Sequence, residues 1–236
     1  MTGLWTERVT ASETGAVPRR AERLRAVGLR VQHGREVTLA YPDLDLAPGA
    51  QLAVTGPSGT GKTTLLHVLA GLLTPQSGEV FSGDFSVTGA SAAGRDLFRR
   101  RSVGYVFQDF HLMPGLSALE NVELGLRVAG VGDARARAEG ALARLDLAHR
   151  RHHRPAQLST GERQRVAVAR AVAHGPGLLL VDEPTAHLDR DRAVTALDLL
   201  QGTASELGAT LIVVTHDPLV AGALPQRLDL SAGGRG

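Results

Sequence analysis

The sequence predicts an α/β protein with a mostly parallel core sheet flanked by helices. Three observations carry this prediction. The apolar segments Gly177–Asp182 and Ala209–Thr215 alternate with segments of helical periodicity, as parallel strands covered on both faces do. A glycine-rich turn joins a further apolar segment, Ala50–Thr55, to a helical one. Short apolar alternations from Leu24 to Leu46 predict an antiparallel β subdomain before that turn.

The order of elements along the chain predicts one large domain with a helical insertion. Residues 1–22 are polar and unpatterned, so we expect a flexible tail ahead of a domain spanning residues 23–236. Residues of about 109–174 show helical patterns without a strong strand signal, which favours an inserted α-helical subdomain. Further strands are expected at Gly78–Val87 and Val103–Phe107. The expected helices lie at Ala118–Val128, Asp133–Leu145, Thr160–His174 and Arg190–Leu207.

Composition and charge are those of an ordinary globular protein. Hydrophobic residues make up 43% of the 236 and charged residues 21%. The apolar runs are far shorter than the roughly 20 residues that cross a bilayer, so the chain is expected in the cytoplasm. The net charge is only +2, and we expect no nucleic-acid partner, because such a footprint needs clustered charge. The densest basic cluster, His149–Arg154, favours a solvated linker; contact with an acidic partner or a pH response is the alternative.

The glycine-rich turn fits the pattern G-x-x-x-x-G-K-[ST] of a phosphate-binding loop. Its glycines let backbone N–H groups surround a phosphate, and the helix start adds partial positive charge. Lys62 is the only lysine among 26 basic residues, which indicates that this position needs a compact ammonium. We expect Lys62 to reach the β- and γ-phosphates of ATP and Thr63 to bind Mg²⁺. The predicted nucleotide-binding residues of this loop are Gly56, Pro57, Ser58, Gly59, Thr60, Gly61, Lys62, Thr63 and Thr64.

Two acids, Asp182 and Glu183, close an apolar strand at the edge of a parallel sheet where ligands bind. We expect Asp182 to hold Mg²⁺, directly or through water, and Glu183 to polarise the attacking water. A solvated acidic turn is the alternative. A guanine-reading GTPase of the Ras type is excluded, because its N/T-K-x-D motif needs a second lysine that the chain lacks.

A second helix start shows a capping pattern. Ser159 and Glu162 have the spacing of a capping box, in which each side chain binds the other residue's backbone N–H. Taken alone, this pattern indicates a well-capped helix and nothing more.

Three segments together resemble the ATP-binding cassette (ABC) proteins: the phosphate loop, LSTGERQRVAVARA at residues 158–171 and LLLVDEPTAHLD at residues 178–189. The resemblance covers about Leu24 to Leu230. It implies a P-loop NTPase fold of the ABC type that hydrolyses ATP. It also implies that Gln108 senses Mg²⁺ and faces a transmembrane partner, that Asp189 lies in a loop crossing a dimer interface, and that His216 contacts the γ-phosphate.

The resemblance further implies a head-to-tail dimer, either a homodimer or a pseudo-homodimer with a second ATPase subunit. Each ATP would lie between the phosphate loop of one copy and Ser159 and Gly161 of the other, where a second helix start is offered to phosphate. ATP would hold the two copies together, and hydrolysis would release them.

Three positions depart from the family's usual pattern. Thr160 replaces the first glycine of a glycine pair, and Glu162 stands where glutamine is common. His33 aligns best with the aromatic residue that stacks on adenine, and a surface-turn histidine is its alternative. We expect an altered dimer affinity and weaker stacking on the adenine.

The segment FHLMPGLSALENV, residues 110–122, is similar to the lipoprotein-releasing and macrolide-export group. It favours an ATP-driven motor subunit of an exporter or of a lipoprotein- or peptide-extruding system. Such a subunit would lie on the inner face of the cell membrane and drive a separate transmembrane permease. The alternatives are a cell-division ATPase that signals through a membrane partner without transport, and a non-transport cassette. The latter is disfavoured because the helical insertion fills the stretch from Gln108 to Leu158.

Overall fold

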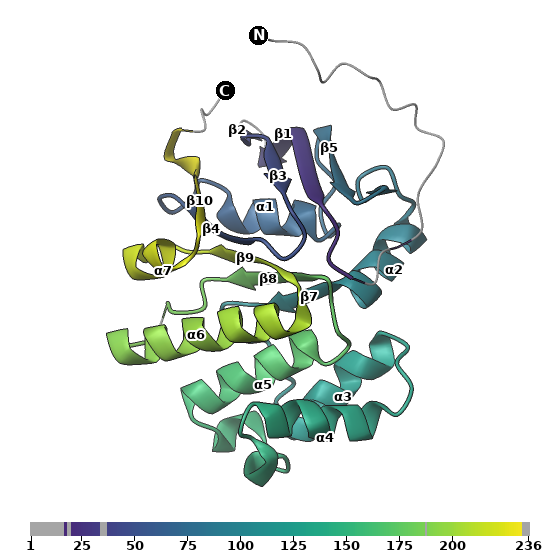
Figure 1. Cartoon of the computed structure of the whole chain (residues 1–236), viewed down its shortest axis with the longest axis vertical. Coiled ribbons are helices and arrows are strands. Elements are labelled where there is room, and N and C mark those ends of the chain that lie inside the picture. The colour runs from purple at the N-terminus through teal and green to yellow at the C-terminus, as the bar shows by residue number, and fades with distance from the viewer. Residues whose placement is uncertain (1–16, 18–19, 34–36, 187, 233–236) are drawn as a thin grey trace.

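Two sheets with a helix between them form the frame of the molecule, shown in a computed structural model of the chain (Figure 1). The structure describes residues 17, 20–33, 37–186 and 188–232. The first sheet is antiparallel and the second is entirely parallel. With the helical insertion below the parallel sheet, this arrangement confirms the fold class predicted from the sequence.

The antiparallel sheet is built around β1 (Leu24–His33). The strand β2 (Val37–Ala40) pairs with the C-terminal half of β1, and β3 (Leu44–Leu46) pairs with its N-terminal half. The strand β5 (Ser77–Ser82) pairs with the other edge of β1. At that edge the backbones of Gly28 and Gly78 approach so closely that a Cβ on Gly78 would stand 2.5 Å from the Gly28 carbonyl. The remaining strand of this sheet is β6 (Phe85–Ser86).

The parallel sheet has the strand order β10-β4-β9-β8-β7. Its central strands are buried on both faces, and successive residues enter two different cores. In β8, Leu178 and Leu180 join the core under the antiparallel sheet, while Leu179 and Val181 join the core beneath. The strands are β4 (Gln51–Thr55), β7 (Val103–Val106), β8 (Leu178–Asp182), β9 (Thr210–Val214) and β10 (Gln226–Asp229).

Helices cover both faces of the parallel sheet (Figure 1). The helix α1 (Lys62–Leu69) lies between the two sheets, and α5 (Thr160–Val172) and α6 (Arg190–Leu207) lie on the opposite face. The insertion packs α3 and α4 against each other and against α5. The other helical elements are α2 (Ala92–Ser102), α3 (Ala118–Val128), α4 (Ala134–Arg144), α7 (Pro218–Ala223), η1 (Ala148–Arg150), η2 (Pro155–Gln157) and η3 (Leu230–Ala232).

The sequence patterns predict α3 and α6 with the observed bounds and do not predict α2, α7 or β10. The helix α2 buries only Phe98 and Ser102, so it lacks the apolar stripe that marks a helix. The strand β10 is a short edge strand without a buried residue. The range of the predicted tail stays a prediction, since most of residues 1–22 lies outside the described part. No helix in the described part of the chain is long and apolar enough to cross a membrane.

Candidate functional site

Three neighbouring parallel strands, β4, β9 and β8, end at the same edge of the sheet (Figure 1). The phosphate-binding loop follows β4 and leads into α1. Asp182 and Glu183 stand at the end of β8, and Thr215 and His216 follow β9. The topology therefore brings together residues that lie more than 150 positions apart in the sequence.

The phosphate-binding loop wraps around its own lysine. Lys62 Nζ donates to the carbonyl oxygens of Gly56 at 2.8 Å and Pro57 at 3.2 Å. Gly59 and Gly61 have left-handed φ angles of 82° and 86°, which L side chains rarely adopt. Lys62 is 8% exposed, and both acceptors of its ammonium are carbonyl groups of the loop itself. It is positioned to meet an anion that the loop surrounds.

Tyr41 supports the loop from the antiparallel sheet. Its hydroxyl donates to the carbonyl of Gly61 at 3.0 Å, and a Cβ on Gly61 would stand 2.5 Å from that hydroxyl oxygen. Burial raises the pKa of Tyr41 to about 12, so the phenol is a neutral donor at physiological pH. No sequence motif marks this contact, and the sequence did not predict it.

Thr63 and Asp182 place two side-chain oxygen groups next to each other at the start of α1. Thr63 Oγ1 donates to Asp182 Oδ1 at 3.2 Å, and Asp182 is 6% exposed. Burial raises the pKa of this carboxyl group, and the hydrogen bond from Thr63 acts against that rise. A buried carboxylate beside a hydroxyl oxygen fits a hard cation such as Mg²⁺.

Glu183 is the most constrained acid of the site. Its backbone is left-handed, with φ 44°, and its N–H donates to the Val214 carbonyl at 3.0 Å. One carboxylate oxygen lies 2.9 Å from His216 Nδ1, and the other lies 3.9 Å from Lys62 Nζ. A strained backbone held by a neighbouring strand is typical of functional positions. The carboxylate is thus fixed between an imidazole and an ammonium.

Gln108 lies close to Glu183 and to the start of α5. It lines a cavity of about 220 Å³ together with Thr160, Arg163 and Glu183. The loop after β7 is therefore adjacent to Glu183 and to the start of α5. Gln108 itself is exposed.

The start of α5 has the predicted capping box. Ser159 Oγ accepts from the Glu162 N–H at 3.2 Å, and Glu162 Oε2 accepts from the Ser159 N–H at 2.8 Å. Thr160 Oγ1 accepts from Arg163 Nη2 at 3.0 Å, so the hydroxyl at this unusual position has a local partner. A Cβ on Gly161 would meet no atom within 4 Å. The packing of this chain alone therefore does not require a glycine there.

Gln164 is a buried link that the sequence analysis missed. It is 3% exposed, and its Nε2 donates to the carbonyl of Pro184 at 3.1 Å, which ties α5 to the loop after Glu183. Its spacing to Val168 and Ala171 places it on the buried face of α5. A polar residue at helical spacing from apolar ones was the sequence feature that could have identified this buried contact.

Two other predicted positions have separate surroundings. Asp189 caps α6, and its Oδ1 accepts from the Arg192 N–H at 3.0 Å. His33 ends β1 opposite Val37, but its side chain lies outside the described part of the chain, so stacking on adenine stays a prediction.

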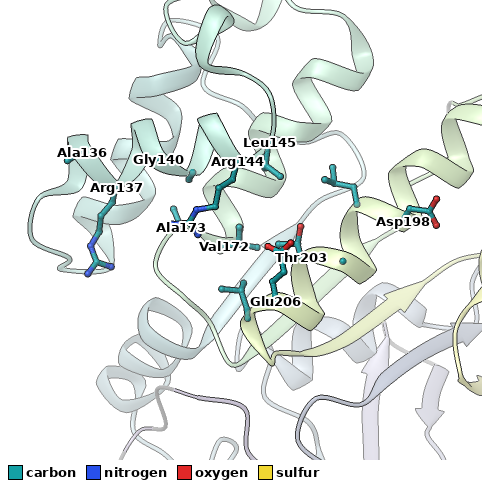
Figure 2. A pocket seen from close by; sticks show the side chains of 14 residues that line it. Ala136, Arg137, Gly140, Arg144, Leu145, Val172, Ala173, Asp198, Thr203 and Glu206 are labelled. Carbon is teal, nitrogen blue, oxygen red and sulfur yellow. The ribbon is translucent and has the colours of Figure 1, made fainter.

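A larger cavity lies away from these residues. It has a volume of about 740 Å³ and lies between α4, the end of α5 and α6, with Arg144 and Glu206 on its walls (Figure 2). None of the predicted site residues lines it. Cavity size therefore does not identify the site; the convergence of polar groups at the sheet edge does.

Comparisons with known proteins agree with this geometry. A protein-family model described as "ABC transporter" matches residues 39–186. The lipoprotein-releasing system ATP-binding protein LolD of Xanthomonas campestris is 42% identical over 228 residues, which cover 95% of this chain and 94% of that protein. LolD of Idiomarina loihiensis is 44% identical over 207 residues, covering 86% and 90% of the two chains.

Solved structures show the same likeness. The cassette MJ0796, in a dimeric post-hydrolysis state bound to ADP and Pi, is similar with a TM-score of 0.77 and 34% identity, covering 90% of this chain and 97% of that one. The cbiO1 protein of Clostridium perfringens, part of the cbiONQ complex, has a TM-score of 0.76 and 30% identity, covering 85% and 82%.

Proposed function

The chain belongs to the ABC transporter family as an ATP-binding and ATP-hydrolysing subunit, and we propose that it hydrolyses ATP with the residues at the edge of the parallel sheet. One observation carries this assignment. The Glu183 carboxylate is fixed between His216 and Lys62, directly beside a phosphate-binding loop. These groups match the needs of phosphoryl transfer, namely a held phosphate, an oriented water and charge compensation.

The loop from Gly56 to Thr64 binds the phosphates of ATP through its backbone N–H groups and the start of α1. Lys62 exchanges its bonds to the Gly56 and Pro57 carbonyls for bonds to the β- and γ-phosphate oxygens. It is already desolvated in this position, so the exchange replaces two neutral acceptors by anionic ones. His33 contacts the adenine.

Mg²⁺ fits beside the loop, where Thr63 and Asp182 offer oxygen ligands and Gln108 completes the set from the neighbouring cavity. When bound, the cation neutralises charge on the β- and γ-phosphates. The buried Asp182 carboxylate, whose pKa is raised by burial, gains a compensating positive charge there.

Glu183 polarises the attacking water. The water oxygen forms a bond to the γ-phosphorus, its proton moves toward the Glu183 carboxylate, and the bond to the bridging oxygen breaks to release ADP. His216 orients Glu183 through Nδ1 and contacts the γ-phosphate. The left-handed backbone of Glu183 keeps the carboxylate in this position.

The ATP site is completed by a second copy of the chain or by a second ATPase subunit. Ser159 and Gly161 of one copy contact the γ-phosphate held by the other, and Asp189 lies near the interface. The open space at Gly161 supports this arrangement, because a glycine that its own chain does not need suits the close approach of a ligand. The dimeric MJ0796 structures support it by similarity.

A separate transmembrane permease is the proposed partner, and it holds the subunit on the inner face of the cell membrane. Similarity to LolD favours an exporter or a lipoprotein- or peptide-extruding type. Co-purification of the tagged chain from native membranes tests this partner. A permease in the purified complex is expected; a ribosome or nucleic acid without any membrane protein would contradict the assignment.

The catalytic assignment is tested by Glu183→Gln, which keeps the size of the side chain and removes the base. ATP binding is expected to persist while hydrolysis slows on the order of 100- to 1,000-fold or more. The exposed Glu79 on β5 supplies the control, and Glu79→Gln should hydrolyse ATP at the unaltered rate. Normal turnover by Glu183→Gln would refute the assignment of the base.

A further inference from the structure

Arg150 in η1 holds the start of α5 from outside the helix. Its Nε donates to Glu162 Oε1 at 3.0 Å, while Oε2 of the same carboxylate accepts the Ser159 N–H at 2.8 Å. Ser159 Oγ in turn accepts the Glu162 N–H. The ion pair therefore fixes the carboxylate that itself fixes the backbone of Ser159.

A second capping box in the chain shows that capping alone does not need an arginine. Ser117 and Glu120 form the same reciprocal box at the start of α3. Among the described residues, Glu120 forms no ion pair, and it is exposed. The Glu162 side chain, by contrast, is 14% exposed and paired with Arg150. The box at α5 therefore carries an ion pair that the box at α3 does without, although the charges of Arg154 and Arg135 help to lower the pKa of Glu120.

The chemistry of Ser159 indicates what that role is. Its hydroxyl oxygen accepts the Glu162 N–H, and its hydroxyl proton, which can bond to the Glu162 carboxylate in the chain alone, can also rotate toward an anionic oxygen. The backbone N–H of Ser159 lowers the pKa of Glu162, with smaller contributions from the Ser159 hydroxyl and Arg150. The chain thus places a carboxylate charge within one helical turn of the serine that, in the proposed two-chain site, meets phosphate.

We propose that Arg150 is a positioning residue that neutralises Glu162, so that the ATP phosphates held by a second copy of the chain meet Ser159 without an opposing negative charge. The inference rests on the proposed two-chain ATP site. Like charges at close range weaken association strongly, and the effect is screened by salt. The neighbouring arginines have other local partners: Arg163 binds Thr160 and the Leu158 carbonyl, and Arg151 binds the Ala148 carbonyl.

The test is a double-mutant cycle in the full-length Glu183→Gln chain, with ATP-dependent dimerisation measured by sedimentation at low and high salt. Arg150→Gln should raise the dimer dissociation constant about tenfold, because it leaves Glu162 uncompensated. Glu162→Gln in the same chain should restore most of that affinity, and the defect of Arg150→Gln should shrink in high salt. Arg151→Gln is the matched control and should dimerise like its parent. Circular dichroism checks that each variant is folded, and Arg150→Lys, which retains the charge, should lose less affinity.

The outcomes separate this inference from the function on which it rests. Unchanged dimerisation of Arg150→Gln, or a defect that is insensitive to salt and not rescued by Glu162→Gln, would overturn the role of Arg150 and leave the two-chain site intact. A parent chain that stays monomeric with ATP under all conditions would overturn both.

Discussion

At the scale of single residues, the phosphate-binding loop depends on a crowded glycine. Gly61 has a left-handed φ of 86°. A Cβ on this residue would stand 2.5 Å from the Tyr41 hydroxyl oxygen and 2.6 Å from Leu39 Cδ1. Gly59 has a similar φ of 82° but open space around it. The two glycines therefore separate the cost of a strained backbone from the cost of a steric clash.

Substitution of each glycine by alanine should reveal that difference. Gly59→Ala is expected to lower the free energy of unfolding by about 1–2 kcal/mol, from the left-handed backbone alone. Gly61→Ala should lose about 1–3 kcal/mol more, because the clash forces Tyr41 and Leu39 to move. Denaturant unfolding of both variants measures the two losses in free energy of unfolding. Adding Tyr41→Phe to Gly61→Ala should recover part of the extra loss, because it removes the hydroxyl that the new Cβ would meet. Equal losses in the two variants would show that the contact with Tyr41 does not constrain the loop.

The candidate site residues that the sequence suggested belong to ordered motifs, and the residues that support them through tertiary contacts were missed. Lys62 and Asp182 were proposed from motifs that stand next to a predicted strand, and His216 was proposed from the resemblance to the ABC proteins. Tyr41 could not, since its contact with Gly61 depends on how the antiparallel sheet packs over the loop. The link from Arg150 to Glu162 was likewise hidden, although the capping box itself was readable.

At the scale of elements, α2 shows how a polar helix is attached to the core. Phe98 is fully buried and stacks on Phe85 at a centroid distance of 5.4 Å. Ser91 caps the helix, and Arg99 Nη1 donates to the Gly71 carbonyl beyond α1. Phe98 is thus the one buried apolar side chain that this helix contributes to the core.

Phe98→Ala should destabilise the protein by about 3–5 kcal/mol, because it opens a cavity in the core between the antiparallel and the parallel sheet. Arg101→Ala, at an exposed position of the same helix, is the control and should change stability by less than about 0.5 kcal/mol. Thermal or denaturant unfolding compares them. Similar small losses in both variants would mean that α2 is held by its polar contacts instead.

Elements were predictable where local patterns and tertiary burial agree. The helices α3 and α6 begin at capping residues, Ser117 and Asp189, and carry buried positions at helical spacing. The helix α2 lacks such a stripe, and β10 takes its position from pairing with β4 and not from its own apolar residues. Pairing partners of this kind cannot be read from one segment alone.

At the scale of the whole molecule, the parallel sheet separates two cores and gathers the proposed catalytic groups at one edge. The upper core joins α1 to the antiparallel sheet, and the lower core joins the sheet to α5, α6 and the insertion. Gln164 links α5 to the loop after Glu183, so the start of α5 is mechanically connected to the proposed general base. In the proposed two-chain site, that helix start serves the partner's ATP, and each copy completes the other.

Native mass spectrometry of the Glu183→Gln chain with ATP and Mg²⁺ tests whether two chains enclose two ATP molecules. We expect a complex of two chains with two ATP molecules, which disappears when ADP replaces ATP. The unaltered chain should show this complex only briefly, since it hydrolyses the nucleotide. A Glu183→Gln monomer that binds ATP without dimerising, or a dimer that forms equally well without nucleotide, would contradict it.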